Sequence, residues 1–308
     1  MAQTQKREPK IALWLGLGFL AVAAVIFYIA YHVIFPSDDS DKPFGGAKVK
    51  KQEIWAADGL KVSAEELGMV SSRSWDREAV YLKVQNSGSS EKVLRCTALS
   101  VNGVAVQPEL AAEIPAGQTV TVPVLLDRSS LYYMQVYTVG TISMELAAFD
   151  PASMSQTARS GMITLQTNKV KKADTPQCLL DTDIFYDAGG IRIGTAELSV
   201  AYSQSSSAMR FYVENDSSED VQIIPKEVRV NGKPYEVARK NADGSVYDDR
   251  GVGEGYVFPA GTKGTFYYEL EWEPLDDVLP LDNVTGVCRI YDNGSGELLE
   301  EAEFTYRQ

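Results

Sequence analysis

The stretch "VQNSGSSEKVLRCTALSVNG", Val84 to Gly103, has a counterpart later in the chain, "VENDSSEDVQIIPKEVRVNG", Val213 to Gly232. The two align over twenty residues without a gap, at an offset of 129, with six identical positions. Matching segments surround them in the same order. "DGLKVSAEEL" precedes the first stretch and "GGIRIGTAEL" the second, while "IPAG" and "FPAG" follow them. The sequence therefore predicts two copies of one domain.

Each copy has the pattern of antiparallel β-structure. "AVYLKVQN", residues 79–86, alternates apolar with mostly polar side chains, which is typical of a half-buried strand. Asn102-Gly103 and Asn231-Gly232 stand between apolar runs and predict tight hairpin turns, since such turns need positive φ at both central residues. About seven short strands per copy indicate a mainly β fold, in which two tandem immunoglobulin-like (Ig-like) antiparallel β-sandwich domains follow an N-terminal segment.

That N-terminal segment predicts a single transmembrane helix. Residues 11–35 contain no Asp, Glu, Lys or Arg. A helix of this length spans about 38 Å, enough for a hydrocarbon core of about 30 Å. Basic residues precede it and aspartates follow it, so residues 1–10 are expected in the cytoplasm and the rest outside. A cleaved signal peptide is the alternative, but its apolar region is normally shorter.

The remaining boundaries follow from composition. Residues 36–50 are polar, with two prolines and two glycines, and predict a flexible tether. The first domain is expected at 51–168, a linker at 169–176 and the second domain at 177–308. The formal net charge of the chain is −13, and the second copy is far more acidic than the first. This balance argues against nucleic acid and against anionic lipid headgroups as partners.

Residue types that carry catalysis are scarce. The only histidine, His32, lies at the outer edge of the predicted anchor, which excludes a Ser-His-Asp triad or a His-based zinc site in the rest of the chain. Cys96 is expected to be a buried thiol, and Cys178 and Cys288 are candidates for a disulfide. We therefore expect no enzyme activity, no cofactor and no metal.

One insertion distinguishes the copies. Between the VNG and PAG motifs the second copy has 15 more residues than the first, within Ala238–Tyr256. Because the fold forms without them in the first copy, this loop is a candidate partner-binding site. Calcium is an alternative, but the spacing of a calcium loop is not met. An inert insertion is the other alternative. The candidate residues are Asp243, Tyr247, Asp248, Asp249, Arg250, Glu254 and Tyr256.

The chain resembles a family. An N-terminal anchor followed by repeats with a "G-[LI]-x-[VI]" opening strand, a "V-x-N-x-S" strand end as at Val213–Ser217, "VNG" and "PAG" is similar to uncharacterised membrane-anchored Ig-like repeat proteins of Gram-positive bacteria. The resemblance implies a fold and carries no catalytic residues.

We therefore expect a single-pass, extracytoplasmic binding or structural protein of the cell envelope, whose partner is an envelope protein or a wall component. The alternative is a sensor or regulatory anchor that acts through helix association, for which Gly16, Gly18 and Ala21 offer small residues.

Overall fold

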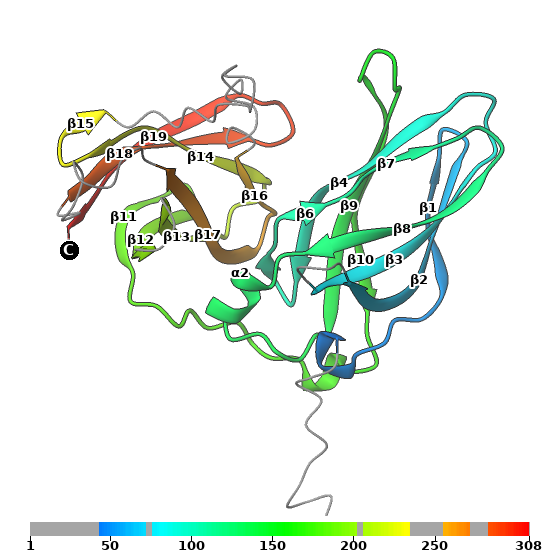
Figure 1. Ribbon diagram of the computed structural model, residues 1–308, viewed down its shortest axis with the longest axis horizontal. Helices are drawn as coiled ribbons and strands as arrows, with labels where there is room; N and C mark the ends of the chain where they lie inside the picture. Colours follow the sequence, from blue (N-terminus) through cyan, green and yellow to red (C-terminus); the bar gives the residue numbers. More distant parts are fainter. Residues whose placement is uncertain (1–42, 72–75, 202–205, 235–254, 272–282, 308) are drawn as a thin grey trace, which may run out of the picture. The chain divides into compact units, whose positions relative to one another are not determined.

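The computed structural model describes residues 43–71, 76–201, 206–234, 255–271 and 283–307. This part of the chain is mainly β, and its sheets pack as sandwiches (Figure 1). The predicted cytoplasmic tail, 1–10, and transmembrane helix, 11–35, lie outside the described residues. Within the described ranges, no helix is both long and apolar enough to cross a membrane.

The first copy packs two sheets around one core. Its first sheet contains, in spatial order, β1 (Gln52–Ala57), β2 (Leu60–Ser71), β3 (Asp76–Asn86), β8 (Thr119–Leu126) and β6 (Pro108–Glu109). Its second sheet contains β10 (Gln156–Gln166), β9 (Thr141–Phe149) and β4 (Lys92–Val101), with β5 (Val104–Ala105) and β7 (Ala111–Ile114) both paired to β4. The alternation predicted for β3 is confirmed, because Val80, Leu82 and Val84 are buried whereas Lys83 and Gln85 are exposed.

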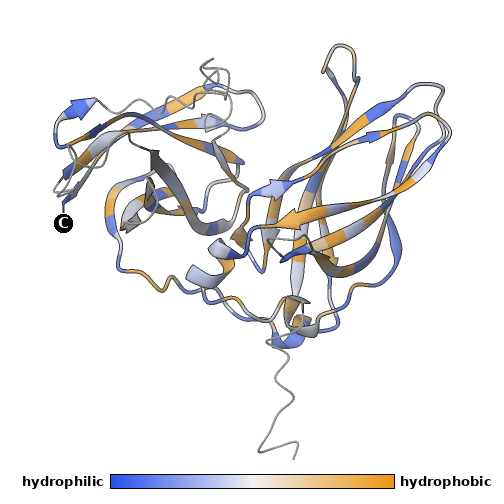
Figure 2. Ribbon diagram, in the orientation of Figure 1, coloured by the Kyte–Doolittle hydropathy of each residue, from blue (hydrophilic) through white to orange (hydrophobic). Residues whose placement is uncertain are grey.

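The second copy repeats this plan with a more aromatic core. Its first sheet contains β17 (Thr262–Glu271), β13 (Ser206–Asn215), β12 (Ile191–Ala201) and β11 (Asp183–Ala188). Its second sheet contains β15 (Lys233–Pro234), β14 (Val221–Val230), β18 (Asn283–Asp292) and β19 (Leu298–Arg307), with β16 (Tyr256–Phe258) on β14. Phe211 stacks on Phe266 and meets Phe304 edge-on, each at 5.0 Å between ring centroids. Orange, hydrophobic residues recur along the strands of both copies in Figure 2.

The repeated Asn-Gly pairs form the predicted tight turns. Asn102 and Gly103 have φ of 50° and 81°, and Asn231 and Gly232 have φ of 51° and 78°. Each pair joins a long strand to a two-residue strand, β4 to β5 and β14 to β15. Positive φ at both central residues is the conformation that Asn and Gly tolerate at least cost, which explains why the motif occurs in both copies.

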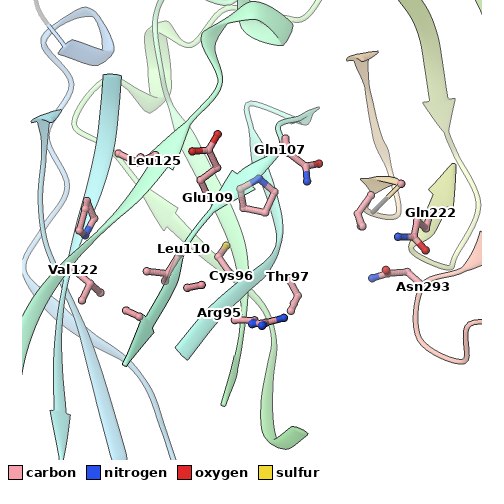
Figure 3. A pocket seen from close by; sticks show the side chains of 16 residues that line it. Arg95, Cys96, Thr97, Gln107, Glu109, Leu110, Val122, Leu125, Gln222 and Asn293 are labelled. Atoms are coloured by element: carbon pink, nitrogen blue, oxygen red, sulfur yellow. The ribbon is translucent and has the colours of Figure 1, made fainter. Parts of the chain in front are cut away.

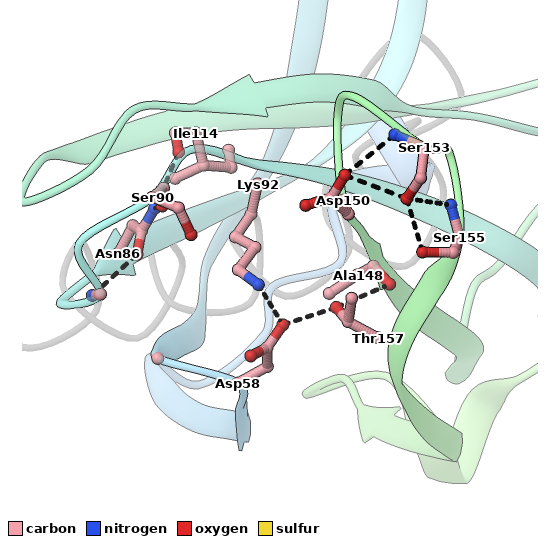
Figure 4. Close-up of polar contacts among 12 residues, drawn as sticks. Asp58, Asn86, Ser90, Lys92, Ile114, Ala148, Asp150, Ser153, Ser155 and Thr157 are labelled. Atoms are coloured by element: carbon pink, nitrogen blue, oxygen red, sulfur yellow. Dashed lines mark hydrogen bonds and ion pairs between the residues drawn. The ribbon is translucent and has the colours of Figure 1, made fainter.

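The repeated asparagine before each motif is a buried structural residue. Asn86, at the end of β3, donates from Nδ2 to the carbonyl oxygens of Ser90 and Ile114, each at 2.9 Å (Figure 4). Asn215, at the end of β13, donates in the same way to Glu219 at 2.9 Å and Phe258 at 2.8 Å. Both side chains are fully buried. The asparagine therefore ties the end of one strand to the segment before the PAG turn.

A polar contact joins the two sheets of the first copy at one end. Asp58, in the turn between β1 and β2, accepts hydrogen bonds from Lys92 Nζ at 2.6 Å and from the Thr157 hydroxyl (Figure 4). Lys92 belongs to β4 and Thr157 to β10, so a turn of the first sheet meets two strands of the second there. These hydrogen bonds, that of Lys92 above all, lower the pKa of Asp58 below its ordinary value.

The expectation of a flexible tether over 36–50 is wrong for its last part. Pro43–Gly46 forms a 3-10 turn, and the Phe44 side chain is fully buried in the first core. The Phe44 backbone N–H also donates to the buried carboxylate of Glu78. The polar composition predicted coil. Burial of the large apolar Phe44 side chain in the first core stabilises an ordered conformation instead.

A short helix was not predicted. α2 (Arg128–Tyr133) follows β8. Its N-cap is Asp127, whose side chain accepts a hydrogen bond from the Ser129 N–H at 2.8 Å. Six residues are too few to show helical periodicity in the sequence.

The region predicted as a linker at 169–176 is docked on the first copy. It includes a 3-10 turn, Val170–Lys172. Asp174 accepts backbone hydrogen bonds from Tyr137 at 2.9 Å and Thr138 at 2.7 Å, and Leu179 N donates to Tyr133 O at 2.7 Å. The segment that precedes β11 is therefore hydrogen-bonded to the end of α2 and to the residues after it, and β11 starts at Asp183.

The two copies share a sheet. β5 of the first copy pairs in parallel with β17 of the second at Val104 and Lys263, which makes one nine-stranded sheet out of strands from both. α2 adds to the contact, because the Ser130 hydroxyl donates to Thr265 O and the Tyr133 ring lies 3.8 Å from the Arg210 guanidinium. Packing continues across the junction, since Ala105 belongs to the second core.

Candidate functional site

A cleft lies between the two copies. It has a volume of about 810 Å³, within the range of about 300–1,000 Å³ typical of ligand sites. Figure 3 shows Gln222 and Asn293 across the cleft from Gln107, Thr97 and Arg95. The lining residues are Arg95, Cys96, Thr97, Gln107, Pro108, Glu109, Leu110, Ala111, Ala112, Val122, Pro123 and Leu125 from the first copy, and Gln222, Gly255, Val257 and Asn293 from the second.

Strand geometry positions these side chains. Arg95, Cys96 and Thr97 are consecutive in the middle of β4, where the pairing register with β9 shifts between Cys96 and Ala98. Such a bulge turns neighbouring side chains away from strict alternation. Arg95 and Thr97 consequently line the cleft together with the intervening Cys96.

Arg95 has an incomplete set of partners. Its Nε is buried and donates no hydrogen bond to any described residue, and its guanidinium carbon lies 5.2 Å from the centre of the Phe149 ring. A buried donor without a partner costs about 1–3 kcal/mol, a cost that a hydrogen-bonding ligand would remove. The aromatic contact holds the guanidinium in place without using its hydrogen-bond donors.

Thr97 is fixed by a buried carboxylate. Its hydroxyl donates to Glu145 Oε2 at 2.9 Å, and Arg159 Nη2 donates to the same oxygen at 2.6 Å. Hydrogen bonding to Glu145 raises the pKa of Arg159, with further attraction from Asp220 and Asp292 of the second copy. Glu145 and Arg159 therefore hold the Thr97 side chain of β4 in a fixed position.

A smaller cavity of about 350 Å³ adjoins the cleft, and both are lined by Gln107 and Glu109. Glu109 forms an ion pair with Arg77. Tyr256 also lines this cavity, stacks on Phe266 at 4.4 Å and donates its hydroxyl hydrogen to Tyr267 O at 2.8 Å. The tyrosine thus joins the rim of the cavity to the second core.

Most of the predicted partner-binding loop lies outside the described residues. Asp243, Tyr247, Asp248, Asp249, Arg250 and Glu254 lie outside the described residues. The described end of the insertion does reach the cleft, since Gly255 and Val257 line it. A Cβ on Gly255 would come within 2.3 Å of the Ile224 side chain, so this end is packed closely against β14. No group of side chains in the described ranges is arranged to hold a metal ion.

The structure corrects the expectation of a disulfide between Cys178 and Cys288. All three cysteines are free thiols. Cys178 packs against the first core and Cys288 is buried in the second, so the two cannot meet. The expectation that Cys96 is a buried thiol is confirmed. Burial raises its pKa to about 12, which keeps it protonated and a poor nucleophile at neutral pH.

Chemically, the cleft offers three side-chain amides, one hydroxyl, one guanidinium, one thiol, the Glu109 carboxylate that pairs with Arg77, and an apolar wall. This combination suits a polar ligand with several hydrogen-bonding groups, either uncharged or anionic. Sequence reasoning missed the site because its two walls come from different copies, which meet through the β5–β17 contact and through α2. The one local signal was Arg95, a charged residue in the middle of a strand, between Leu94 and Cys96.

No protein-family model matches the chain, and no curated protein matches it. Among solved structures, "The crystal structure of the conserved domain protein from Bacillus anthracis" is similar to it at 9% sequence identity, with a TM-score of 0.25. The match covers 87% of this chain and 93% of that chain. What the cleft can bind is therefore inferred from its own residues.

Proposed function

We propose that this chain is a membrane-anchored, extracytoplasmic binding protein of the cell envelope, whose ligand site is the cleft between its two Ig-like copies. The observation that carries the proposal is Arg95, a cation in a cleft of ligand size, whose buried Nε has no hydrogen-bond partner among the described residues. The three amides around it favour a ligand rich in peptide or sugar groups. A wall component has this chemistry, and an envelope protein is the other partner that fits.

The anchor in this proposal is residues 11–35, as a single-pass helix with the N-terminus in the cytoplasm. Its support is the run of 25 residues without a charged side chain, with basic residues before it and aspartates after it. The resemblance to anchored Ig-like repeat proteins favours the same location.

Binding is favoured over catalysis by the chemistry of the lining. Cys96 is the only strong nucleophile type among the described lining residues, and its raised pKa keeps it a thiol. The only histidine of the chain is His32, within the proposed anchor. A general base for nucleophilic catalysis would therefore have to be a carboxylate, and Glu109 already forms an ion pair with Arg77.

A sensor is the second candidate, favoured by one observation. Phe44 is fixed in the first core, which leaves only residues 36–43 between the proposed membrane helix and a packed residue. A short connection of this kind could pass movement between the first copy and the membrane helix.

The test is binding of the full chain, in detergent, to purified insoluble peptidoglycan, measured by sedimentation. Arg95→Gln should weaken binding about tenfold, because a hydrogen bond from a charged group contributes about 1.5–3 kcal/mol. Arg307→Gln, the same substitution at an exposed site on β19, should bind like the wild type. Equal binding by the Arg95 variant would refute the cleft as the site. A wild-type chain that does not sediment would refute a wall ligand.

A further inference from the structure

Two identical tetrapeptides, KVKK at residues 48–51 and again at 169–172, meet at one end of the first copy. Lys48 N donates to Asn168 Oδ1 at 2.8 Å, and Asn168 N donates to Lys48 O at 3.0 Å. Val49 forms a β-bridge with Thr167 next to this pair. The two segments lie side by side in Figure 1, in blue and green. The lysines of the two tetrapeptides are called the lysine cluster: Lys48, Lys50, Lys51, Lys169, Lys171 and Lys172.

Most of the lysine cluster has no ion-pair partner among the residues that the structure describes. Lys51 pairs with Glu65 at 2.7 Å. The nearby carboxylate of Asp174 is occupied by two backbone N–H groups. Four lysines are exposed and form no ion pair with any residue in the described ranges: Lys48, Lys50, Lys171 and Lys172. A concentration of cations stands out in a chain whose net charge is −13.

We propose that the lysine cluster binds the anionic headgroups of the membrane that carries the anchor. The inference rests on the proposed anchor at 11–35, because only residues 36–42 separate that segment from Pro43. Seven residues span at most about 25 Å when fully extended. Lys48 and Lys50 follow within a few residues, and the backbone contacts above bring the second KVKK to the same place.

Charge complementarity selects this partner. Each basic residue close to an anionic bilayer contributes about a fivefold gain in binding, and the effect fades within a Debye length of about 8 Å at physiological salt. Net charge alone led to the expectation that anionic headgroups are excluded as partners. That expectation treats the surface as uniform, whereas the acidic residues are concentrated in the second copy and the lysine cluster belongs to the first.

The experiment measures lysine acylation on the full chain in nanodiscs, with mass spectrometry as the readout. Discs of phosphatidylglycerol are compared with discs of phosphatidylcholine, at low and at high salt. In anionic discs the four unpaired lysines should be acylated at least about fivefold more slowly than in zwitterionic discs. High salt should remove the difference. The exposed lysines Lys83 and Lys233 should be acylated equally in both discs.

A variant separates the cluster from general proximity to lipid. Lys50→Gln/Lys171→Gln should reduce the protection of Lys48 and Lys172, whereas Lys83→Gln should leave it unchanged. A chain that stays with both kinds of disc but shows equal acylation in them refutes the headgroup contact while the anchor stands. A chain that does not stay with discs at all refutes the anchor and, with it, this proposal.

Discussion

Asn86 and Asn215 explain why part of the sequence is repeated. Each closes the end of a long strand against the segment before a PAG turn, with two hydrogen bonds to carbonyl oxygens, one of which is buried. No aliphatic side chain supplies these bonds, and a buried carbonyl that loses its partner is costly. The repeated stretch therefore preserves a structural junction, and residues that bind are to be sought where the copies differ or meet.

Replacing either asparagine should destabilise its own copy. Asn86→Ala and Asn215→Ala each remove a fully buried side chain that donates two hydrogen bonds, so we expect a loss of about 2–4 kcal/mol in the free energy of unfolding. Denaturant unfolding of the full chain measures this loss. Ser89→Ala, at an exposed site in the same loop, is the control and should cost less than about 0.5 kcal/mol. Losses as small as the control's would show that the asparagines are dispensable.

Asp58 should make the first copy sensitive to acid. Its pKa is lowered in the folded chain by hydrogen bonds from Lys92 and then Thr157. A lowered folded pKa gives stability that is present above the ordinary aspartate pKa of about 3.9 and is lost as the pH falls through the folded value. Asp58→Asn should therefore lower the free energy of unfolding by about 1 kcal/mol at pH 7. The difference should shrink as the pH falls through the folded pKa of Asp58, measured by urea unfolding across pH. A pH-independent difference would mean that the charge plays no part.

At the scale of elements, the segment before β1 is the main departure from expectation. Pro43–Gly46 was expected to be coil, yet it places Phe44 in the first core and a backbone N–H on Glu78. Burial raises the pKa of Glu78, so the carboxylate is an unfavourable core group that this N–H helps to stabilise. The segment is thus an integral part of the first copy.

Removing the Phe44 side chain should show this dependence. Phe44→Ala creates a cavity in the first core and should cost about 3–5 kcal/mol in the free energy of unfolding. Tyr132→Ala, at a side chain that is 55% exposed, is the matched control and should cost far less. Thermal melting of the full chain distinguishes them. If Phe44→Ala melts like the wild type, the segment is a tether after all.

Sequence reasoning reached the strands and turns because their signals are local. Alternation predicts β3, and Asn-Gly predicts the turns at Asn102 and Asn231, since each depends on a few neighbouring residues. It did not reach α2, which is too short to show a period, or the burial of Phe44, which depends on a cavity built by distant strands. The cleft was beyond reach because Arg95 and Asn293 come together only through contacts far apart in the chain.

At the scale of the whole described chain, the junction between the copies gives the site its form. β5 pairs with β17, and α2 contributes Ser130 and Tyr133 to the second copy. If this junction is stable, both walls of the cleft keep one arrangement and can recognise a ligand with little ordering cost. If it opens freely, Arg95 and Asn293 no longer face a common ligand.

Pulsed electron spin resonance between the copies tests this most directly. Spin labels are attached at Thr121→Cys on β8 and Glu303→Cys on β19, both exposed, in a chain carrying Cys178→Ser. Cys96 and Cys288 can stay, because burial raises the pKa of both thiols and keeps them unreactive. We predict one narrow distance distribution that broadens when Ser130→Ala and Tyr133→Ala are added. A broad distribution that these substitutions leave unchanged would contradict a fixed junction and the cleft that depends on it.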